Sequence, residues 1–150
     1  MSQSHSLLYQ HLVFSTKHRQ PLLLEADRDR IHAYVGGVMR TMDSPTVAIG
    51  SIEDHIHILY RHSKRISVED LLCELKSKTS EWMKSLGPAY AKFYWQSGYG
   101  VFSVSASQMD RTEAYVLDQR GRHKRRAFKE EYVGLLKKHK IEYDERYLWD

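Results

Sequence analysis

Residues 46–60, TVAIGSIEDHIHILY, carry the clearest secondary-structure signal in the chain. The runs 46–52 and 55–60 are rich in residues that favour strands, and Glu53 and Asp54 lie between them. This spacing predicts two strands with a short connection, and it places the rest of the chain around a sheet.

On the N-terminal side, the sequence predicts a further strand and a helix. Residues 7–15 are rich in strand formers, and residues 24–42 have apolar residues at helical spacing. The apolar side chains on one side of this helix are Ile31, Tyr34, Val35, Val38 and Met39. The breaker sequence DSP at 43–45 then ends the helix.

On the C-terminal side, a helix is predicted over residues 67–86, before a Gly-Pro pair. Residues 93–105 are extended and interrupted by glycines, which predicts a bent strand or a hairpin. Two more helices are predicted over 108–123 and 128–140.

The order strand, helix, strand, strand, helix, strand is that of the split βαβ, or ferredoxin-like, plan. We therefore expect an α+β fold with an antiparallel sheet and additional C-terminal helices. The sequence has no Pro/Gly/Ser-rich linker and no internal repeat, so residues 1–150 are expected to form a single domain.

Composition excludes several classes of protein. Hydrophobic residues make up 41% and charged residues 28% of the 150 residues, which is typical of a globular chain and not of a disordered one. No apolar run reaches the ~18 residues of a membrane span, and residues 1–10 do not resemble a secretory signal. The lone Cys73 excludes a disulfide or a Cys-based zinc cluster within one chain. We expect a protein of the reducing cytoplasm that does not cross a membrane.

His55 and His57 form the first motif that could carry chemistry. Alternate residues of a strand share a face, so both imidazoles project to one side while Ile56 and Ile58 point into the opposite layer. Two imidazoles on one face can occupy two coordination positions of a divalent metal ion. Two half-buried histidines satisfied by their neighbours have the same spacing, and Leu59 rules out an alternation of three histidines.

Tyr115 and Gln119 form the second motif. Their i, i+4 spacing puts both on one face of the predicted helix, with Arg111 a turn before and Arg122 a turn after. A phenol in such surroundings can attack phosphorus and form a phosphotyrosine, provided that positive charge or a base helps it to lose its proton. A surface tyrosine on a basic helix has the same pattern, so the spacing leaves both interpretations open.

Basic residues gather between Gln119 and Lys129, where no acidic residue occurs. They are Arg120, Arg122, His123, Lys124, Arg125, Arg126 and Lys129. Such a cluster can neutralise the phosphates of a nucleic acid, whereas the net charge of +4 is too small to argue for this partner by itself. A solvated helix end is the other interpretation.

The combination resembles the single-tyrosine HUH transposases (transposase A type), which move insertion sequences as single-stranded DNA. The matching stretches follow the order of that family and are HLVFSTKHR (11–19), DHIHIL (54–59), WQSGYGVFSVS (95–105), YVLDQ (115–119) and FKEEY (128–132). His55 and His57 match the two histidines of the family motif, Tyr115 matches the nucleophile, and Gln119 matches the third metal ligand.

The resemblance implies a metal-dependent transposase that cleaves and rejoins single-stranded DNA at hairpin-bearing element ends through a 5′-phosphotyrosine. It implies Mg²⁺ or Mn²⁺ bound by the two histidines and Gln119, and a homodimer whose active sites are shared between protomers. Imidazole ligands suit Mn²⁺ better than Mg²⁺. The residues expected to contact DNA are Arg111, Arg120, Arg122, Lys124, Arg125 and Arg126.

Two other functions share these features. A domesticated relative would nick repeated palindromes without moving an element. A non-catalytic nucleic-acid module with an RRM-like sheet would stack bases on aromatic side chains, for which Tyr9, Phe14 and Phe102 are the candidates. Only an enzyme would leave a covalent adduct on a suicide oligonucleotide.

Overall fold

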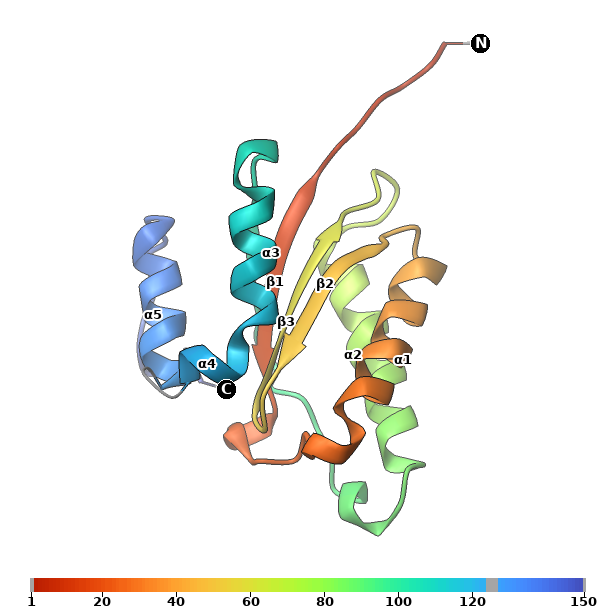
Figure 1. The fold of residues 1–150 in the computed structure, drawn as a ribbon, viewed down its shortest axis with the longest axis vertical. Helices are drawn as coiled ribbons and strands as arrows, with labels where there is room; N and C mark the ends of the chain where they lie inside the picture. Colours follow the sequence, from red (N-terminus) through yellow and green to blue (C-terminus); the bar gives the residue numbers. More distant parts are fainter. Residues whose placement is uncertain (1, 124–126, 150) are drawn as a thin grey trace.

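A four-stranded antiparallel sheet with the order β2-β3-β1-β4 forms the centre of the computed structural model (Figure 1). The structure describes residues 2–123 and 127–149. The strands are β1 (Tyr9–Ser15), β2 (Thr46–Ser51), β3 (His55–Arg61) and β4 (Gly100–Ser103). Since the helices lie between the strands in the expected order, the predicted ferredoxin-like α+β fold is confirmed.

Helices α1 (Arg28–Thr41) and α2 (Val68–Lys84) cover one face of the sheet (Figure 1). Their apolar side chains form a core with the even-numbered residues of β1 and β3, such as Phe14 and Ile58. The hydroxyl of Ser67 accepts a hydrogen bond from the backbone N–H three residues on, at 3.0 Å, and so caps the start of α2.

Helices α3 (Met109–Leu117) and α5 (Phe128–Lys138) lie on the opposite face, and α4 (Gln119–His123) lies between them along the chain (Figure 1). Val116 of α3 packs on Leu59 of the sheet. The buried side chains at the contact with α5 are Val13, Phe102, Phe128, Tyr132 and Leu136. Helices therefore cover both faces of the sheet.

Short 3-10 turns occur at four places in the described residues. They are η1 (Lys17–Arg19), η2 (Glu25–Asp27), η3 (Pro88–Tyr90) and η4 (Ala106–Gln108). Within the described parts of the chain, no helix has both the length and the apolar character that crossing a membrane requires.

The extended segment predicted over 93–105 is a strand only at β4 and makes one isolated bridge, between Thr16 and Trp95. The ammonium group of Lys76 on α2 explains the difference, because it donates to the carbonyl oxygens of Gln96 and Gly98 at 2.8 and 2.7 Å. A side chain takes the acceptors that a neighbouring strand would otherwise use, so this loop is fixed without being part of the sheet.

The helix predicted over 108–123 is interrupted. The backbone of Asp118, with φ −98° and ψ 34°, leaves the helical region and separates α3 from α4. Tyr115 is consequently in the last turn of α3, whereas Gln119 is the first residue of α4.

Gly50 of β2 allows α3 to lie directly on the sheet. A Cβ atom at this position would overlap the backbone carbonyl oxygen of Val116. Gly50 is also the residue paired with His57 on β3, so this contact sets the distance between α3 and the histidine strand.

We expect Gly50→Ala to lower the free energy of unfolding by about 1–3 kcal/mol, because the new methyl group has no space beside Val116. Gly37→Ala is the control. Its Cβ would lie 3.8 Å from the flexible Arg40 side chain, and alanine inside a helix should add about 0.5–1 kcal/mol. Urea unfolding measures both, and an unchanged stability of Gly50→Ala would contradict the close contact of α3 with β2.

Candidate active site

His55 and His57 lie on the face of β3 that α3 and α5 cover, and both side chains are fully buried. Ile56 and Ile58 point into the core on the other face, as the alternation predicted. The Nδ1 atom of His55 lies 2.7 Å from Oδ1 of Asp54, which holds the ring with its Nε2 atom directed away from the β2–β3 connection.

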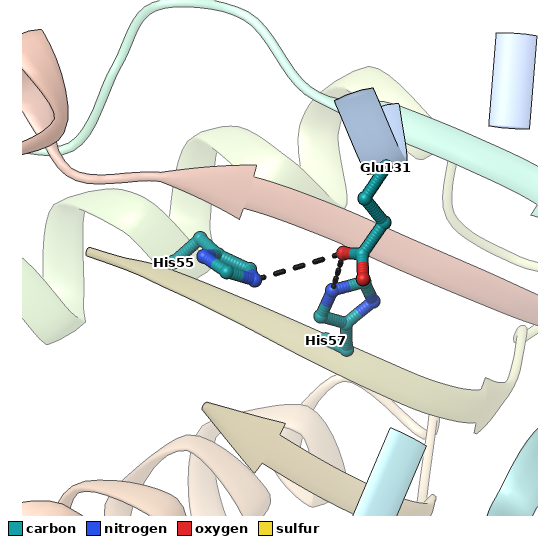
Figure 2. A group of neighbouring side chains, drawn as sticks. All are labelled: His55, His57 and Glu131. Carbon is teal, nitrogen blue, oxygen red and sulfur yellow. Dashed lines mark hydrogen bonds and ion pairs between the residues drawn. The ribbon is translucent and has the colours of Figure 1, made fainter. Parts of the chain in front are cut away.

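Glu131 of α5 meets both imidazoles (Figure 2). One carboxylate oxygen, Oε1, is 2.8 Å from Nε2 of His57 and 3.7 Å from Nε2 of His55. The ligand atoms of the three buried residues all lie within 4.8 Å of one another. Two nitrogens and one oxygen converge in this way when side chains hold a divalent metal ion.

His11 of β1 supports His57 from behind. Its Nε2 atom is 2.7 Å from Nδ1 of His57, and the two rings are stacked with centroids 5.0 Å apart. Burial, with the nearby imidazole of His57 as a smaller cause, lowers the pKa of His11 to about 3. A neutral His11 therefore orients the His57 ring so that Nε2 faces Glu131, and it does so across the physiological pH range.

Tyr115 lies against the same two histidines. Its half-buried ring meets His11 and His57 edge-on, with centroid distances of 5.8 and 5.6 Å. The structure thus brings the predicted nucleophile to the predicted metal ligands within one chain, although sixty residues of sequence separate them.

Gln119 is buried against Gly50, whose Cβ would lie 3.2 Å from its Cγ. Its Nε2 donates to the backbone oxygen of Tyr115 at 3.0 Å. Its Oε1 is buried and has no hydrogen-bond partner among the residues that the structure describes. A buried acceptor in this condition is suited to a ligand that the chain itself does not provide.

The basic residues predicted to contact DNA have different surroundings. Arg111 is exposed on α3, whereas Arg120 forms an ion pair with Glu25. The remaining predicted side chains lie outside the described part of the chain and are Arg122, Lys124, Arg125 and Arg126.

The aromatic residues considered for base stacking on an open sheet are not available for it. Phe14 is buried beneath α1 and α2, and Phe102 is buried beneath α5. Tyr9 is half-buried at the start of β1. Because helices cover both faces of the sheet, an RRM-like platform is not formed by these residues.

Glu131 and His11 are the site residues that sequence reasoning missed. Glu131 had a detectable signal, because it falls within the apolar stripe of α5 between Phe128 and Leu136, where an acidic residue is out of place. His11 begins the family-like stretch 11–19, but no spacing points to its role, since its partner on β3 is 46 residues away in the chain.

A comparison with protein-family models matches residues 4–119 to the family described as "Transposase IS200 like". The chain belongs to this transposase family. The matched residues include both histidines of β3, Tyr115 and Gln119, whereas α5 and Glu131 lie beyond the match. The family is one of DNA-processing enzymes that act in transposition.

Two solved structures share the fold. One is the crystal structure of a protein from Deinococcus radiodurans R1 that carries a provisional assignment as a transposase. Its sequence is 21% identical, the TM-score is 0.61, and the match covers 77% of this chain and 95% of that one. The other is a REP-associated tyrosine transposase bound to a REP hairpin, at 14% identity and a TM-score of 0.59, which covers 82% of this chain and 74% of that one. No curated protein matches the sequence.

Proposed function

We propose that this family member cleaves and rejoins single-stranded DNA at element ends, with Tyr115 as the nucleophile. The observation that carries the proposal is the contact of the Tyr115 ring with His57, whose Nε2 converges with that of His55 on one carboxylate oxygen. A nucleophile beside a cluster of potential metal ligands is the arrangement that phosphoryl transfer requires.

We propose that His55, His57, Gln119 and Glu131 hold Mg²⁺ or Mn²⁺. Two observations support the fit: the buried Oε1 of Gln119, and the convergence of two imidazoles on Glu131. A carboxylate adds a hard oxygen ligand to the imidazoles, and so makes the site better suited to Mg²⁺ than two histidines alone. When bound, the ion would polarise a phosphate oxygen and stabilise the charge that develops on it.

The reaction exchanges one phosphate ester for another. The phenolic oxygen of Tyr115 forms a bond to phosphorus, and the bond from phosphorus to the 3′ oxygen breaks. The tyrosine loses its proton and the departing 3′ oxygen gains one, which leaves a 5′-phosphotyrosine and a free 3′-hydroxyl. Attack by a 3′-hydroxyl on this intermediate then restores the tyrosine. Because the two esters are similar in energy, no ATP is needed.

Tyr115→Phe should abolish the covalent adduct on a suicide oligonucleotide, because the substitution removes only the attacking oxygen. Tyr132→Phe is the control, because Tyr132 is buried among the apolar side chains at the contact of α5 with the sheet. This variant should form the adduct at close to the wild-type level. Denaturing gel electrophoresis measures the adduct. An adduct that persists in Tyr115→Phe would assign the attack to another residue.

Glu131→Gln should weaken Mn²⁺ binding by at least about tenfold, since an amide is a poorer metal ligand than a carboxylate. Its exposed neighbour Glu130 provides the control, because Glu130→Gln makes the same chemical change on the same helix. Calorimetric titration with Mn²⁺ measures the affinity without any reaction. Equal affinities in the two variants would remove Glu131 from the ligand set.

His55→Ala, His57→Ala and Gln119→Ala are expected to reduce Mn²⁺ affinity in the same titration. EDTA should stop cleavage, and full activity in EDTA would contradict the metal site as a whole.

DNA hairpins are the proposed substrate, and the cytoplasm the proposed location. The structural neighbour solved with a REP hairpin supports hairpins as the substrate. It also favours a second candidate function, that of a domesticated relative that nicks repeated palindromes. Both functions use the same catalytic residues. Palindromes that flank the gene at one site indicate a mobile element, whereas palindromes dispersed over the genome indicate the domesticated relative.

A homodimer with shared active sites is the proposed assembly, although one chain already holds Tyr115 beside His57. Chains carrying His57→Ala and chains carrying Tyr115→Phe should each be inactive. If α3 is exchanged, mixed dimers contain one intact site, and refolding the two variants together should restore cleavage. Mass measurement of the mixture identifies the dimers. A monomeric protein, or mixed dimers without activity, would show that each chain completes its own site.

A further inference from the structure

A cavity of about 440 Å³ lies between α3 and α5, and we refer to it as the α3–α5 pocket. One face of α3, with side chains at helical spacing, forms one wall through Arg111, Thr112 and Tyr115, and Gln108 of the preceding turn η4 adjoins it. The end of α5 forms the other wall through Leu135, Lys138 and His139. The proposed nucleophile therefore belongs to the lining of this pocket.

The charge of the pocket is suited to an anion. Arg111 and Lys138 are exposed on opposite walls, and none of the residues described as lining the pocket is acidic. Neither cation forms an ion pair with a described residue, in contrast to Arg120, which is paired with Glu25. Two such side chains on facing walls can contact successive phosphates of one strand.

Aromatic rings form the inner surface of the pocket. Phe102 of β4 is buried and stacks on the imidazole of His139, with centroids 4.5 Å apart and planes 29° apart. His11 lines the pocket beside them. Flat rings below a cationic rim are the combination by which proteins bind unpaired bases, and the volume falls within the about 300–1,000 Å³ of small-ligand sites.

We propose that the α3–α5 pocket binds one unpaired nucleotide of the DNA strand, next to the phosphate that Tyr115 attacks. The base packs on the half-buried ring of His139, which Phe102 supports from the other side, and the backbone phosphates on either side contact Arg111 and Lys138. A paired base would have to leave its stack to enter, so the pocket selects single-stranded DNA. The proposal rests on the strand-cleavage function proposed above and gives the substrate strand its position.

The wall from α5 lies outside the residues that match the family model, which end at 119. In this proposal, α5 and the residue after it therefore contact the DNA strand next to Tyr115, through Leu135, Lys138 and His139. The same C-terminal helix provides Glu131 to the histidines, so α5 contributes both to the cluster and to the pocket.

Strand binding is tested in the Tyr115→Phe background, where no cleavage occurs. The probe is a fluorescein-labelled oligothymidine of about 12 nucleotides, a length within the range of single-strand sites, and its duplex with oligoadenosine is the second probe. Arg111→Glu and Lys138→Glu reverse the charge of each wall, and Thr112→Trp fills the pocket without a change of charge. Lys137→Glu is the matched control, because Lys137 is exposed beside Lys138 and does not line the pocket.

Arg111→Glu and Lys138→Glu should each weaken single-strand binding at least about tenfold. The slope of the logarithm of the binding constant against the logarithm of the salt concentration should become smaller in magnitude by about 0.7 for each lost phosphate contact. Thr112→Trp should weaken single-strand binding at least about fivefold, through the lost base contact, and leave duplex binding unchanged. Lys137→Glu should stay within about twofold of the parent. Single-strand affinity that is unchanged in Thr112→Trp, or charge reversals that act no more than Lys137→Glu, would overturn the proposal.

Crosslinking gives a test that needs no substitution. A strand with 5-iododeoxyuridine at successive positions should crosslink on irradiation to the peptide that contains His139, and no crosslink to this peptide would overturn the proposal. The outcome is separable from strand cleavage. If the pocket variants bind the single strand with the parent affinity and form the adduct at the wild-type level, the pocket proposal alone is overturned. If the pocket variants bind the strand more weakly but the wild-type protein forms no adduct, the cleavage proposal alone is overturned.

Discussion

The burial of two imidazoles in the middle of a sheet is the constraint on which the rest of the structure depends. A buried polar group without a partner costs about 1–3 kcal/mol, so His55 and His57 must be satisfied from elements around β3. Asp54 provides a partner from the β2–β3 connection, His11 from the neighbouring strand, and Glu131 from α5. Helix α5 is consequently held by a polar contact to the sheet as well as by apolar packing.

Local patterns in the sequence were enough to predict most of the fold. Alternation over 55–60 placed both histidines on one face, and the order of the elements indicated the ferredoxin-like plan, because each depends only on neighbouring residues. The prediction over 93–105 was wrong in extent for the opposite reason. Lys76 reaches this segment from α2 and takes its carbonyl groups, and a contact between residues about twenty positions apart leaves no periodicity in either of them.

The same distinction separates the parts of the site. Spacing along one strand or one helix suggested His55 with His57 and Tyr115 with Gln119. The structure brings Tyr115 against His57 and Gln119 against Gly50, with the helix broken between the second pair. The apolar stripe of α5 distinguishes Glu131 from Glu130, but no spacing in the sequence relates Glu131 to the histidines, since only the docking of α5 brings the carboxylate to them. The placement of α5 thus contains information that the match to the family model, which ends at 119, does not.

The chain order of the cluster has a consequence for biosynthesis. His57 and Glu131 are 74 residues apart, and the carboxylate comes from the last of the described helices. All four strands and α3 precede it, so a growing chain can assemble the sheet and position the tyrosine before the carboxylate has been translated. A contact of such long sequence separation also costs loop-closure entropy before it stabilises the fold. Completion of the cluster of His55, His57 and Glu131 therefore waits for synthesis of the C-terminal helix. A chain that terminates after α4 would keep the residues that match the family model while lacking the carboxylate that joins the two histidines.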